Sequence, residues 1–189
     1  MKILGIAASP VKAGNNDQII DYALKRAKDK GFAAEKISLA SNEVKGCIAC
    51  DLCKDKKGEC SIKDAMAKIN KKLIEADAII VSSPVYFGTI SSQLKALFDR
   101  TLTLRRDSFK LKNKLGAAIA VGRSRNGGQE YAIHAIHSWM HIHGMIVVGD
   151  NNHFGGIVVS PFDKDEVGKR TVDDTVDKVC EVLSMVGKD

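Results

Sequence analysis

Short apolar runs rich in branched residues alternate with amphipathic helical segments along most of the chain. The runs that predict strands are residues 2–8, 33–39, 78–83, 115–121 and 145–148. Strands that alternate with crossover helices form a parallel sheet that is covered by helices on both faces. We therefore predict an α/β fold with a doubly wound, five-stranded parallel sheet, built as a single domain over residues 1–189.

The segments between these runs carry apolar residues at helical spacing. One predicted helix begins after the Gly14–Asn16 turn and ends at Gly31, and another is capped by Asp64. Further helices are expected at residues 90–104 and 127–143, and a last one contains Val172, Val176, Val179 and Leu183. In a doubly wound sheet, ligands bind beyond the carboxyl ends of the strands, where the strand order reverses.

Four of the five cysteines gather in a loop, residues 44–62, that follows the second predicted strand. They are Cys47, Cys50, Cys53 and Cys60. Three thiols at two-residue gaps can converge on one object while a fourth closes the other side, which suits a cubane iron–sulfur cluster. A zinc site is a second interpretation, although structural zinc sites usually have two pairs of closely spaced ligands separated by a longer spacer. Two disulfides or free thiols are a third reading.

Charge and hydropathy narrow the class of protein. The net charge is +6, but basic and acidic residues are interleaved and only 5% of residues are aromatic, which argues against a nucleic-acid partner. No run approaches the roughly 20 apolar residues of a membrane span, and the apolar N-terminal run is too short for a signal peptide. We expect a cytoplasmic protein with no membrane partner. In that reducing compartment, clustered thiols bind metal or perform redox chemistry more often than they pair.

Two strand-to-helix loops predict the first part of a ligand pocket. In the loop after the first strand, Ser9, Lys12, Asn15 and Asn16 offer hydroxyl, ammonium and amide groups at a helix start, where backbone N–H groups bind phosphate. Plain helix capping is the alternative there. The loop after the third strand contains Pro84, Val85, Tyr86, Phe87 and Gly88. Its glycine permits a close approach to a flat ligand, and its aromatics form a wall unless they are core or interface residues.

The loop after the fourth strand predicts the rest of the pocket. It contains Gly122, Arg125, Asn126, Gly127 and Gly128. The glycines allow backbone N–H groups to donate to carbonyl and ring-nitrogen acceptors. Either Arg123 or Arg125 offers a positive charge to a reduced ring, and a solvated loop is the alternative for both arginines.

These loops also carry a family resemblance. The segments Ser9-Pro-x-Lys12-x-Gly14-Asn15, Pro84-Val-Tyr-Phe-Gly88 and Gly127-Gly128-Gln129-Glu130 resemble the flavin-contact loops of the NADPH-dependent FMN reductase superfamily. With the compact cysteine motif and the stretch 138–156, the chain is similar to the iron–sulfur flavoprotein branch of that superfamily. The resemblance implies a flavodoxin-like fold, FMN, one [4Fe–4S] cluster on the four cysteines, and a homodimer or homotetramer that places the two centres near one another.

Three positions depart from the pattern that the resemblance implies. Val11 stands where the family often has arginine, and Asn16 stands where it often has threonine, so each removes one expected phosphate partner. Ser61 occupies the place of the proline that follows the last cluster ligand in bacterial ferredoxins.

The function implied by the resemblance is that of a flavin-dependent oxidoreductase, with no side chain assigned as catalytic. Electrons would pass from a low-potential, ferredoxin-like donor through the cluster to FMN, and then to a small-molecule or protein acceptor that takes two electrons. The alternative is an NAD(P)H-dependent FMN or quinone reductase with zinc-bound or free thiols. A third class is a redox sensor or electron carrier without enzymatic activity.

Other residue types give weaker signals. His134, His137 and His141 share one helix face, which predicts a packing or subunit-interface stripe more readily than a metal site. The remaining cysteine, Cys180, lies on the apolar face of the last predicted helix and is expected to be a small buried hydrophobic residue.

Overall fold

The described residues form a six-stranded sheet in which β2, β1, β3, β4 and β5 follow one another and β6 also pairs with β4. The computed structural model describes residues 1–56 and 58–187. All paired strands are parallel. The strands are β1 (Lys2–Ala7), β2 (Ala33–Ser38), β3 (Ala78–Pro84), β4 (Leu115–Gly122), β5 (Ile146–Val148) and β6 (Gly156–Val159). This order is that of a flavodoxin-like sheet, so the predicted fold class is confirmed.

The outer strand next to β4 is divided into two pieces, which differs from the five predicted strands. β5 pairs with β4 from Leu115 to Ala117, and β6 continues alongside β4 from Ile119 to Gly122. We did not predict β6 because it has only four residues and follows a segment rich in glycine and asparagine. Such a short run carries little periodic signal.

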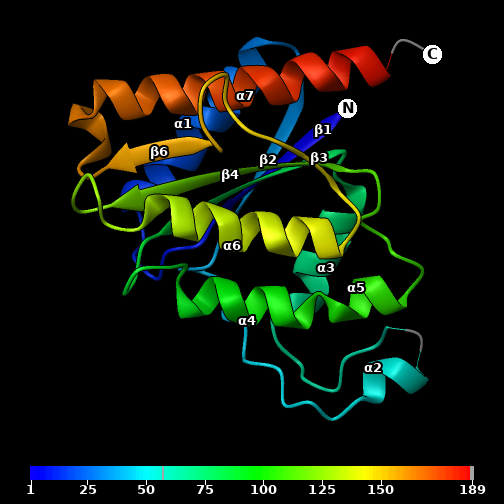
Figure 1. Ribbon diagram of the computed structural model, residues 1–189. Coiled ribbons are helices and arrows are strands. Elements are labelled where there is room, and N and C mark those ends of the chain that lie inside the picture. Colours follow the sequence, from blue (N-terminus) through cyan, green and yellow to red (C-terminus); the bar gives the residue numbers. More distant parts are fainter. Residues whose placement is uncertain (57, 188–189) are drawn as a thin grey trace.

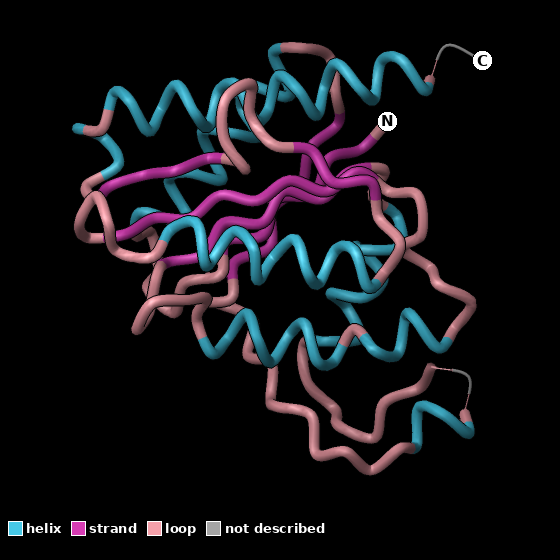
Figure 2. The backbone as a smooth tube through the Cα atoms, in the orientation of Figure 1, coloured by secondary structure: helices cyan, strands magenta, loops and turns pink. Residues whose placement is uncertain are grey.

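Helices cover both faces of the sheet (Figures 1 and 2). On one face lie α1 (Asn15–Asp29) and α7 (Glu166–Val186), and on the other lie α3 (Met66–Glu75), α4 (Ser92–Arg100) and α6 (Gln129–Ile142). Shorter elements are α2 (Leu52–Asp55), α5 (Leu102–Arg106) and the 3-10 turn η1 (Phe162–Lys164). The predicted helix 90–104 is therefore two helices that meet at Thr101.

Alternating side chains of the strands build two apolar cores, one on each face. On β1, Leu4 and Ile6 pack with α3, α4 and α6, whereas Ile3 and Ala7 pack with α1 and α7. Every residue of β3 and β4 is buried, as expected for central parallel strands. The carboxyl ends of β1, β3 and β4 therefore form a rigid edge from which three loops project.

None of the helices in the described part of the chain, residues 1–56 and 58–187, is long and apolar enough to cross a bilayer.

Candidate cofactor cavity and cysteine loop

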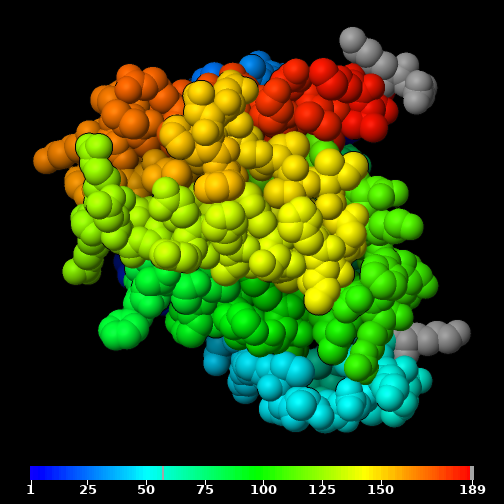
Figure 3. Space-filling model, in the orientation of Figure 1, coloured from blue at the N-terminus to red at the C-terminus, as the bar shows by residue number. Residues whose placement is uncertain are grey.

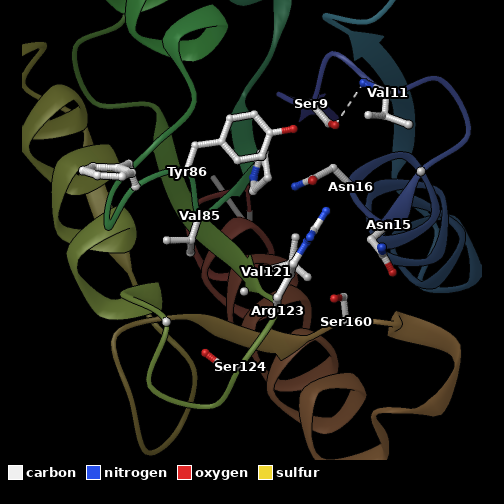
Figure 4. A pocket seen from close by; sticks show the side chains of 15 residues that line it. Ser9, Val11, Asn15, Asn16, Val85, Tyr86, Val121, Arg123, Ser124 and Ser160 are labelled. Carbon is white, nitrogen blue, oxygen red and sulfur yellow. Dashed lines mark hydrogen bonds between the residues drawn. The ribbon is translucent and has the colours of Figure 1, made fainter.

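A cavity of about 730 Å³ lies at the carboxyl ends of β1, β3 and β4, and we call it the cofactor cavity (Figure 4). Its volume falls in the range typical of small-molecule and cofactor sites. The loops after these three strands form its walls, and Ser160, directly after β6, adds to them. The sheet edge thus brings together segments that lie far apart in the sequence.

Most of the predicted pocket residues line this cavity. They are Ser9, Asn15, Asn16, Pro84, Val85, Tyr86, Phe87, Gly122 and Gly127. Other predicted residues belong to the same loops but do not line the cavity, namely Lys12, Gly88, Arg125, Asn126 and Gly128. The side chains of Lys12, Arg125 and Asn126 are exposed to solvent. Their position in the loop is correct, but their expected contact with a ligand remains a prediction.

Gly88 and Gly128 shape the cavity from behind its wall. Residues Tyr86 to Thr89 form a tight turn whose ends exchange backbone hydrogen bonds of 2.8 and 3.2 Å. The central residues Phe87 and Gly88 have φ angles of +49° and +88°. Gly128 has a φ of +104°, and a methyl group added there would lie 2.8 Å from the carbonyl oxygen of Gly88. The second and third loops therefore touch through two glycine backbones.

The loop after β1 is arranged around the start of α1. Gly14 is the N-cap of α1 and offers no side-chain cap, so backbone N–H groups of the first turn are available to a ligand. Around them, Ser9 Oγ accepts from the N–H of Val11 at 3.1 Å, and Asp17 Oδ2 accepts from the N–H of Ala13 at 2.9 Å. Side-chain hydrogen bonds thus fix the loop, while the backbone N–H groups at the start of α1 stay available to bind a phosphate.

Two asparagines at this helix start differ in their contacts. Asn16 is 2% exposed, and its Nδ2 donates to Ser82 Oγ on β3 at 2.8 Å. The side-chain oxygen of Asn15 accepts from the N–H of Phe162 at 2.8 Å, which leaves its amide nitrogen available to a ligand. The polar side chain of Asn16 is thus bonded to the sheet while it still borders the cavity.

Six further residues line the cavity, namely Val11, Gly14, Val121, Arg123, Ser124 and Ser160. Arg123 is the alternative to Arg125 that the sequence offers, Val11 and Gly14 belong to the predicted first loop, and Val121, Ser124 and Ser160 were not predicted. Arg123 is the most informative, because Figure 4 shows its side chain extending from the end of β4 toward Asn16, whereas Arg125 lies outside the lining. Arg123 directly follows the last residue of β4, whereas Arg125 lies two residues further along the loop.

Gln129, at the start of α6, fixes the third loop from inside the protein. Its side chain is 1% exposed, its Oε1 accepts from the N–H of Gly127 at 3.0 Å, and its Nε2 donates to the carbonyl of Ser124 at 2.7 Å. One buried amide therefore sets the shape of the loop that carries Arg123.

The four clustered cysteines line a second cavity of about 150 Å³, which we call the cysteine cavity. It lies between the loop 44–62 and the junction of α4 and α5, where Asp99, Arg100, Leu102 and Thr103 complete its lining. In Figures 1 and 3 the loop, drawn in cyan, forms a ledge beneath these two helices. All four cysteines are free thiols, exposed or half-buried. The four cysteines thus line one cavity, and their ligation of a common cluster remains a prediction.

The local environment of the thiols suits metal ligation. Cys50 Sγ lies 3.2 Å from Ser61 Oγ, and hydrogen bonds from Ser61 and from the backbone of Leu52 lower the pKa of the Cys50 thiol. A lower pKa favours the thiolate, which is the ligand form. Within the described ranges, 1–56 and 58–187, no three histidine, cysteine or acidic side chains are placed to hold one metal ion.

Buried and exposed ion pairs attach the cysteine loop to α4 and α5. Arg100 pairs with Asp64 at 2.8 Å, and both side chains are almost fully buried. Although burial opposes both charges, their mutual hydrogen bonds lower the pKa of Asp64 and raise that of Arg100. At the far end of the loop, the exposed Arg106 lies 3.3 Å from Asp51 and 3.7 Å from Cys53 Sγ.

The two cavities lie at opposite ends of α4. At its start, Ser91 Oγ donates to the carbonyl of Ala8 at 2.7 Å, and the N–H of Ser91 donates to Ser83 Oγ at 3.2 Å, which ties the helix to the ends of β1 and β3. At its end, Asp99 and Arg100 line the cysteine cavity. A helix of nine residues spans about 13 Å. The cysteine loop leaves β2 at the cofactor edge, as predicted, but carries its thiols away from that edge.

The other sequence predictions concern the histidine stripe and the last cysteine. His134 and His141 are exposed, and His137 is partly buried, with desolvation lowering its pKa to about 4. The His134 ring also packs 4.5 Å from the Phe154 ring, measured between centroids. Cys180 is 4% exposed within the core between α1 and α7, and burial raises the pKa of its thiol, so its prediction as a buried residue is confirmed.

Comparisons with known proteins agree with this arrangement. Residues 1–156 match the family model described as NADPH-dependent FMN reductase. The chain is 53% identical to an iron-sulfur flavoprotein of Methanosarcina thermophila, covering 100% of this chain and 98% of that protein. It is 47% identical to an iron-sulfur flavoprotein of Methanocaldococcus jannaschii, covering 100% of both chains. The fold resembles a WrbA-like flavodoxin from Agrobacterium tumefaciens, with a TM-score of 0.71, 17% identity and 97% coverage of each chain.

Proposed function

The chain belongs to the NADPH-dependent FMN reductase family, and from that premise we propose that it is an iron–sulfur flavoprotein with FMN in the cofactor cavity and a [4Fe–4S] cluster in the cysteine cavity. Membership of the family makes it a flavin-dependent oxidoreductase. When bound, the cluster would accept single electrons from a low-potential, ferredoxin-like donor, and FMN would collect them for a two-electron acceptor.

The residues of the cofactor cavity support FMN. The open first turn of α1 would bind the phosphate through backbone N–H groups, with the amide of Asn15 beside them. Tyr86 and Val85 would line the flat ring on one side. Arg123 would supply the positive charge that stabilises a negative ring, a role for which the sequence offers either Arg123 or Arg125. We therefore assign the ring contact to Arg123.

The residues of the cysteine cavity support an iron–sulfur cluster. Cys47, Cys50, Cys53 and Cys60 face one small cavity, and a four-iron cluster needs one thiolate for each iron. That convergence of four thiols in a chain that also has a flavin-sized cavity is the observation that carries the proposal.

We propose that copies of this chain assemble into a homodimer or homotetramer. Within one chain the length of α4 and the loops at its ends separate the cysteine cavity from the cofactor cavity. A cysteine loop on the molecular surface is accessible to a second copy (Figure 3). Assembly would bring the thiols of one chain toward the cofactor cavity of another.

Metal and flavin analysis tests the proposal directly. After anaerobic purification, we expect FMN, iron and acid-labile sulfide in ratios of one to four to four per chain, since one cubane holds four irons and four sulfides. Zinc without sulfide would instead support the alternative, a reductase whose thiols bind zinc. FMN without any metal would leave the cofactor cavity supported and the cluster excluded.

Stopped-flow kinetics then separates the two electron donors. The family description names NADPH, so an NAD(P)H-dependent FMN or quinone reductase is the second candidate. We expect reduced ferredoxin to bleach the flavin absorbance of the cluster-loaded protein rapidly, while NADPH and NADH do so slowly. Rapid reduction by NADPH that persists after cluster removal would favour the second candidate.

A further inference from the structure

One buried arginine contacts both ends of the cysteine loop. Arg100 is 2% exposed. Its Nη1 donates to the carbonyl of Lys45 at 2.9 Å, before the first cysteine, and its Nη2 lies 3.3 Å from the carbonyl of Ile62, after the last cysteine. The same two nitrogens donate to Asp64 Oδ2 and Oδ1 at 2.8 and 3.1 Å. A single guanidinium therefore joins two segments that enclose all four thiols.

The carboxylate of Asp64 completes this junction. Its Oδ2 accepts from the N–H of Lys45 at 2.9 Å, and its Oδ1 accepts from the N–H of Met66 at 3.0 Å. Asp64 thereby connects the start of the loop to the first residue of α3, although the N-cap of this helix is Ala65 rather than the predicted Asp64.

The third guanidinium nitrogen of Arg100, Nε, takes no part in these contacts. Among the described residues, its buried Nε has no hydrogen-bond partner. Arg100 lines the cysteine cavity together with Cys60. An unpaired buried donor costs about 1–3 kcal/mol, and more when it is charged. A negatively charged sulfur acceptor in the cavity would remove that cost.

We propose that Arg100 is the positioning residue of the cysteine loop: through Asp64 it joins the ends of the loop before iron binds, and its Nε–H donates to a sulfur once the cavity is filled. This inference rests on the proposed function, because the sulfur acceptor belongs to the cluster or its thiolates. Lysine cannot replace it, since one ammonium cannot span Lys45, Ile62 and Asp64 as a planar guanidinium does.

The test compares Arg100→Lys and Arg100→Gln with the matched control Arg26→Gln. Arg26 forms a two-point ion pair with Asp177, at 2.6 and 2.8 Å, between α1 and α7 on the opposite face of the sheet. The control therefore removes a comparable pair without touching the loop. For each protein we would measure iron and sulfide after anaerobic reconstitution, the rate of cluster loss to a chelator, the midpoint potential, and FMN content.

We expect both Arg100 variants to lose the cluster about 10- to 100-fold faster than the wild type, because loss of an outer-shell partner typically weakens metal affinity by that factor. In Arg100→Gln the remaining cluster should have a more negative midpoint potential, because a buried positive charge that favours the reduced state is gone. Arg100→Lys retains the charge and should shift the potential less. Arg26→Gln should keep wild-type cluster lifetime and potential.

Amide hydrogen exchange in the metal-free protein tests the first half of the inference without the cluster. The N–H groups of Lys45 and Met66 should exchange slowly in the wild type and faster in Arg100→Lys. Asp64→Asn, which keeps a side chain of the same shape, should also speed exchange at Lys45. If Arg100→Gln fails to fold, this variant tests whether the Arg100–Asp64 pair holds the metal-free loop. Slow exchange in all variants would overturn the role of Arg100 in the empty loop.

The outcomes distinguish this inference from the proposed function. A wild-type protein without iron and sulfide would overturn both. A wild-type protein with a full cluster, and Arg100 variants with the same cluster lifetime and potential, would overturn only the role of Arg100.

Discussion

The cofactor cavity and the cysteine loop lie at the two ends of one helix, yet the protein holds them in different ways. The walls of the cofactor cavity leave β1, β3 and β4, and every residue of β3 and β4 is buried. The described residues of the cysteine loop, 44–56 and 58–62, form no strand, and its cysteines are exposed or half-buried. It is fixed by side chains of α4 and α5, above all by the buried Arg100–Asp64 pair.

This difference predicts how the two regions respond to change. The geometry of the cofactor cavity is a property of the whole sheet, so a change that does not unfold the protein should alter it only locally. The geometry of the cysteine loop depends on a few side chains and on its ligands. Substitutions in the loop should therefore remove the cluster and leave both the fold and FMN binding intact.

The largest effect is expected from Cys53→Ala. Removing one of four ligands should abolish the visible absorbance of the cluster, while FMN remains bound because the cofactor cavity is at the other end of α4. Absorption spectra with iron and flavin analysis would measure both. Cys180→Ala is the matched control, since Cys180 is buried between α1 and α7 and should affect neither cofactor. Full cluster occupancy in Cys53→Ala would remove Cys53 from the ligands.

Acid should act on the packing that α4 shares with α6. His143 is 2% exposed, its Nε2 lies 2.9 Å from Thr101 Oγ1, and burial with the nearby charge of Arg105 lowers its pKa to about 4. The unfolded state, with a pKa near 6.5, binds more protons between these values, so stability falls as the pH drops. From pH 7 to pH 5 this one group should lower the free energy of unfolding by about 2 kcal/mol.

Urea unfolding of the metal-free protein at both pH values would measure this loss. His143→Gln keeps an amide donor for Thr101 but does not titrate, so its loss of stability between pH 7 and pH 5 should be smaller by about 2 kcal/mol. Equal losses in the two proteins would show that His143 does not stay neutral in the folded state. Thr101 directly follows Arg100, so protonation of His143 should also disturb the end of α4 beside the cysteine loop. Release of the cluster at a higher pH than that of unfolding would show this effect.

A smaller effect is expected at the glycine contact behind the cofactor cavity. Gly128→Ala would place a methyl group 2.8 Å from the carbonyl oxygen of Gly88, at a φ of +104°. The displaced loops should weaken FMN binding by about 1–2 kcal/mol, or roughly tenfold, with no change in iron content. Titration of the apoprotein with FMN would measure it.

Gly31→Ala is the control for backbone strain alone. Gly31 has a φ of +89°, but no atom lies within 4 Å of an added methyl group. It should therefore lower stability by about 1 kcal/mol and leave FMN affinity unchanged. If both variants bound FMN equally well, the contact between Gly88 and Gly128 would not shape the cavity.

The sequence was sufficient for the parts of the molecule that follow from strand topology. Parallel strands bring their carboxyl ends to one edge, so the three loops of the cofactor cavity were predictable, and so was the placement of the four closely spaced cysteines around one cavity. The sequence could not predict which arginine enters the cavity. The orientation of Arg123, rather than Arg125, depends on the loop shape that Gln129 sets through its hydrogen bonds.

Contacts between segments that lie far apart in the chain also could not be predicted from the sequence. Arg100 lies in a helix whose spacing predicts only an amphipathic face, and a buried arginine in such a face carries no local signal of its partner. Its contacts with Lys45 and Asp64 require that α4 end beside the loop, which depends on the helix break at Thr101. Likewise β6 forms because β4 extends past the end of β5 and presents an unpaired edge.

The smallest effect is expected from Arg106→Gln, at the outer end of the cysteine loop. Arg106 Nη2 lies 3.3 Å from Asp51 Oδ1, and Nη1 lies 3.7 Å from Cys53 Sγ, but both charged side chains are accessible to water. Exposed ion pairs contribute about 0–1 kcal/mol and are screened by salt. The rate of cluster loss should therefore rise less than about fivefold, and 0.5 M salt should reproduce part of that rise in the wild type. An effect as large as that of Arg100→Gln would mean that the loop is held at its outer end rather than at its base, and would reverse the contrast between buried and exposed attachment.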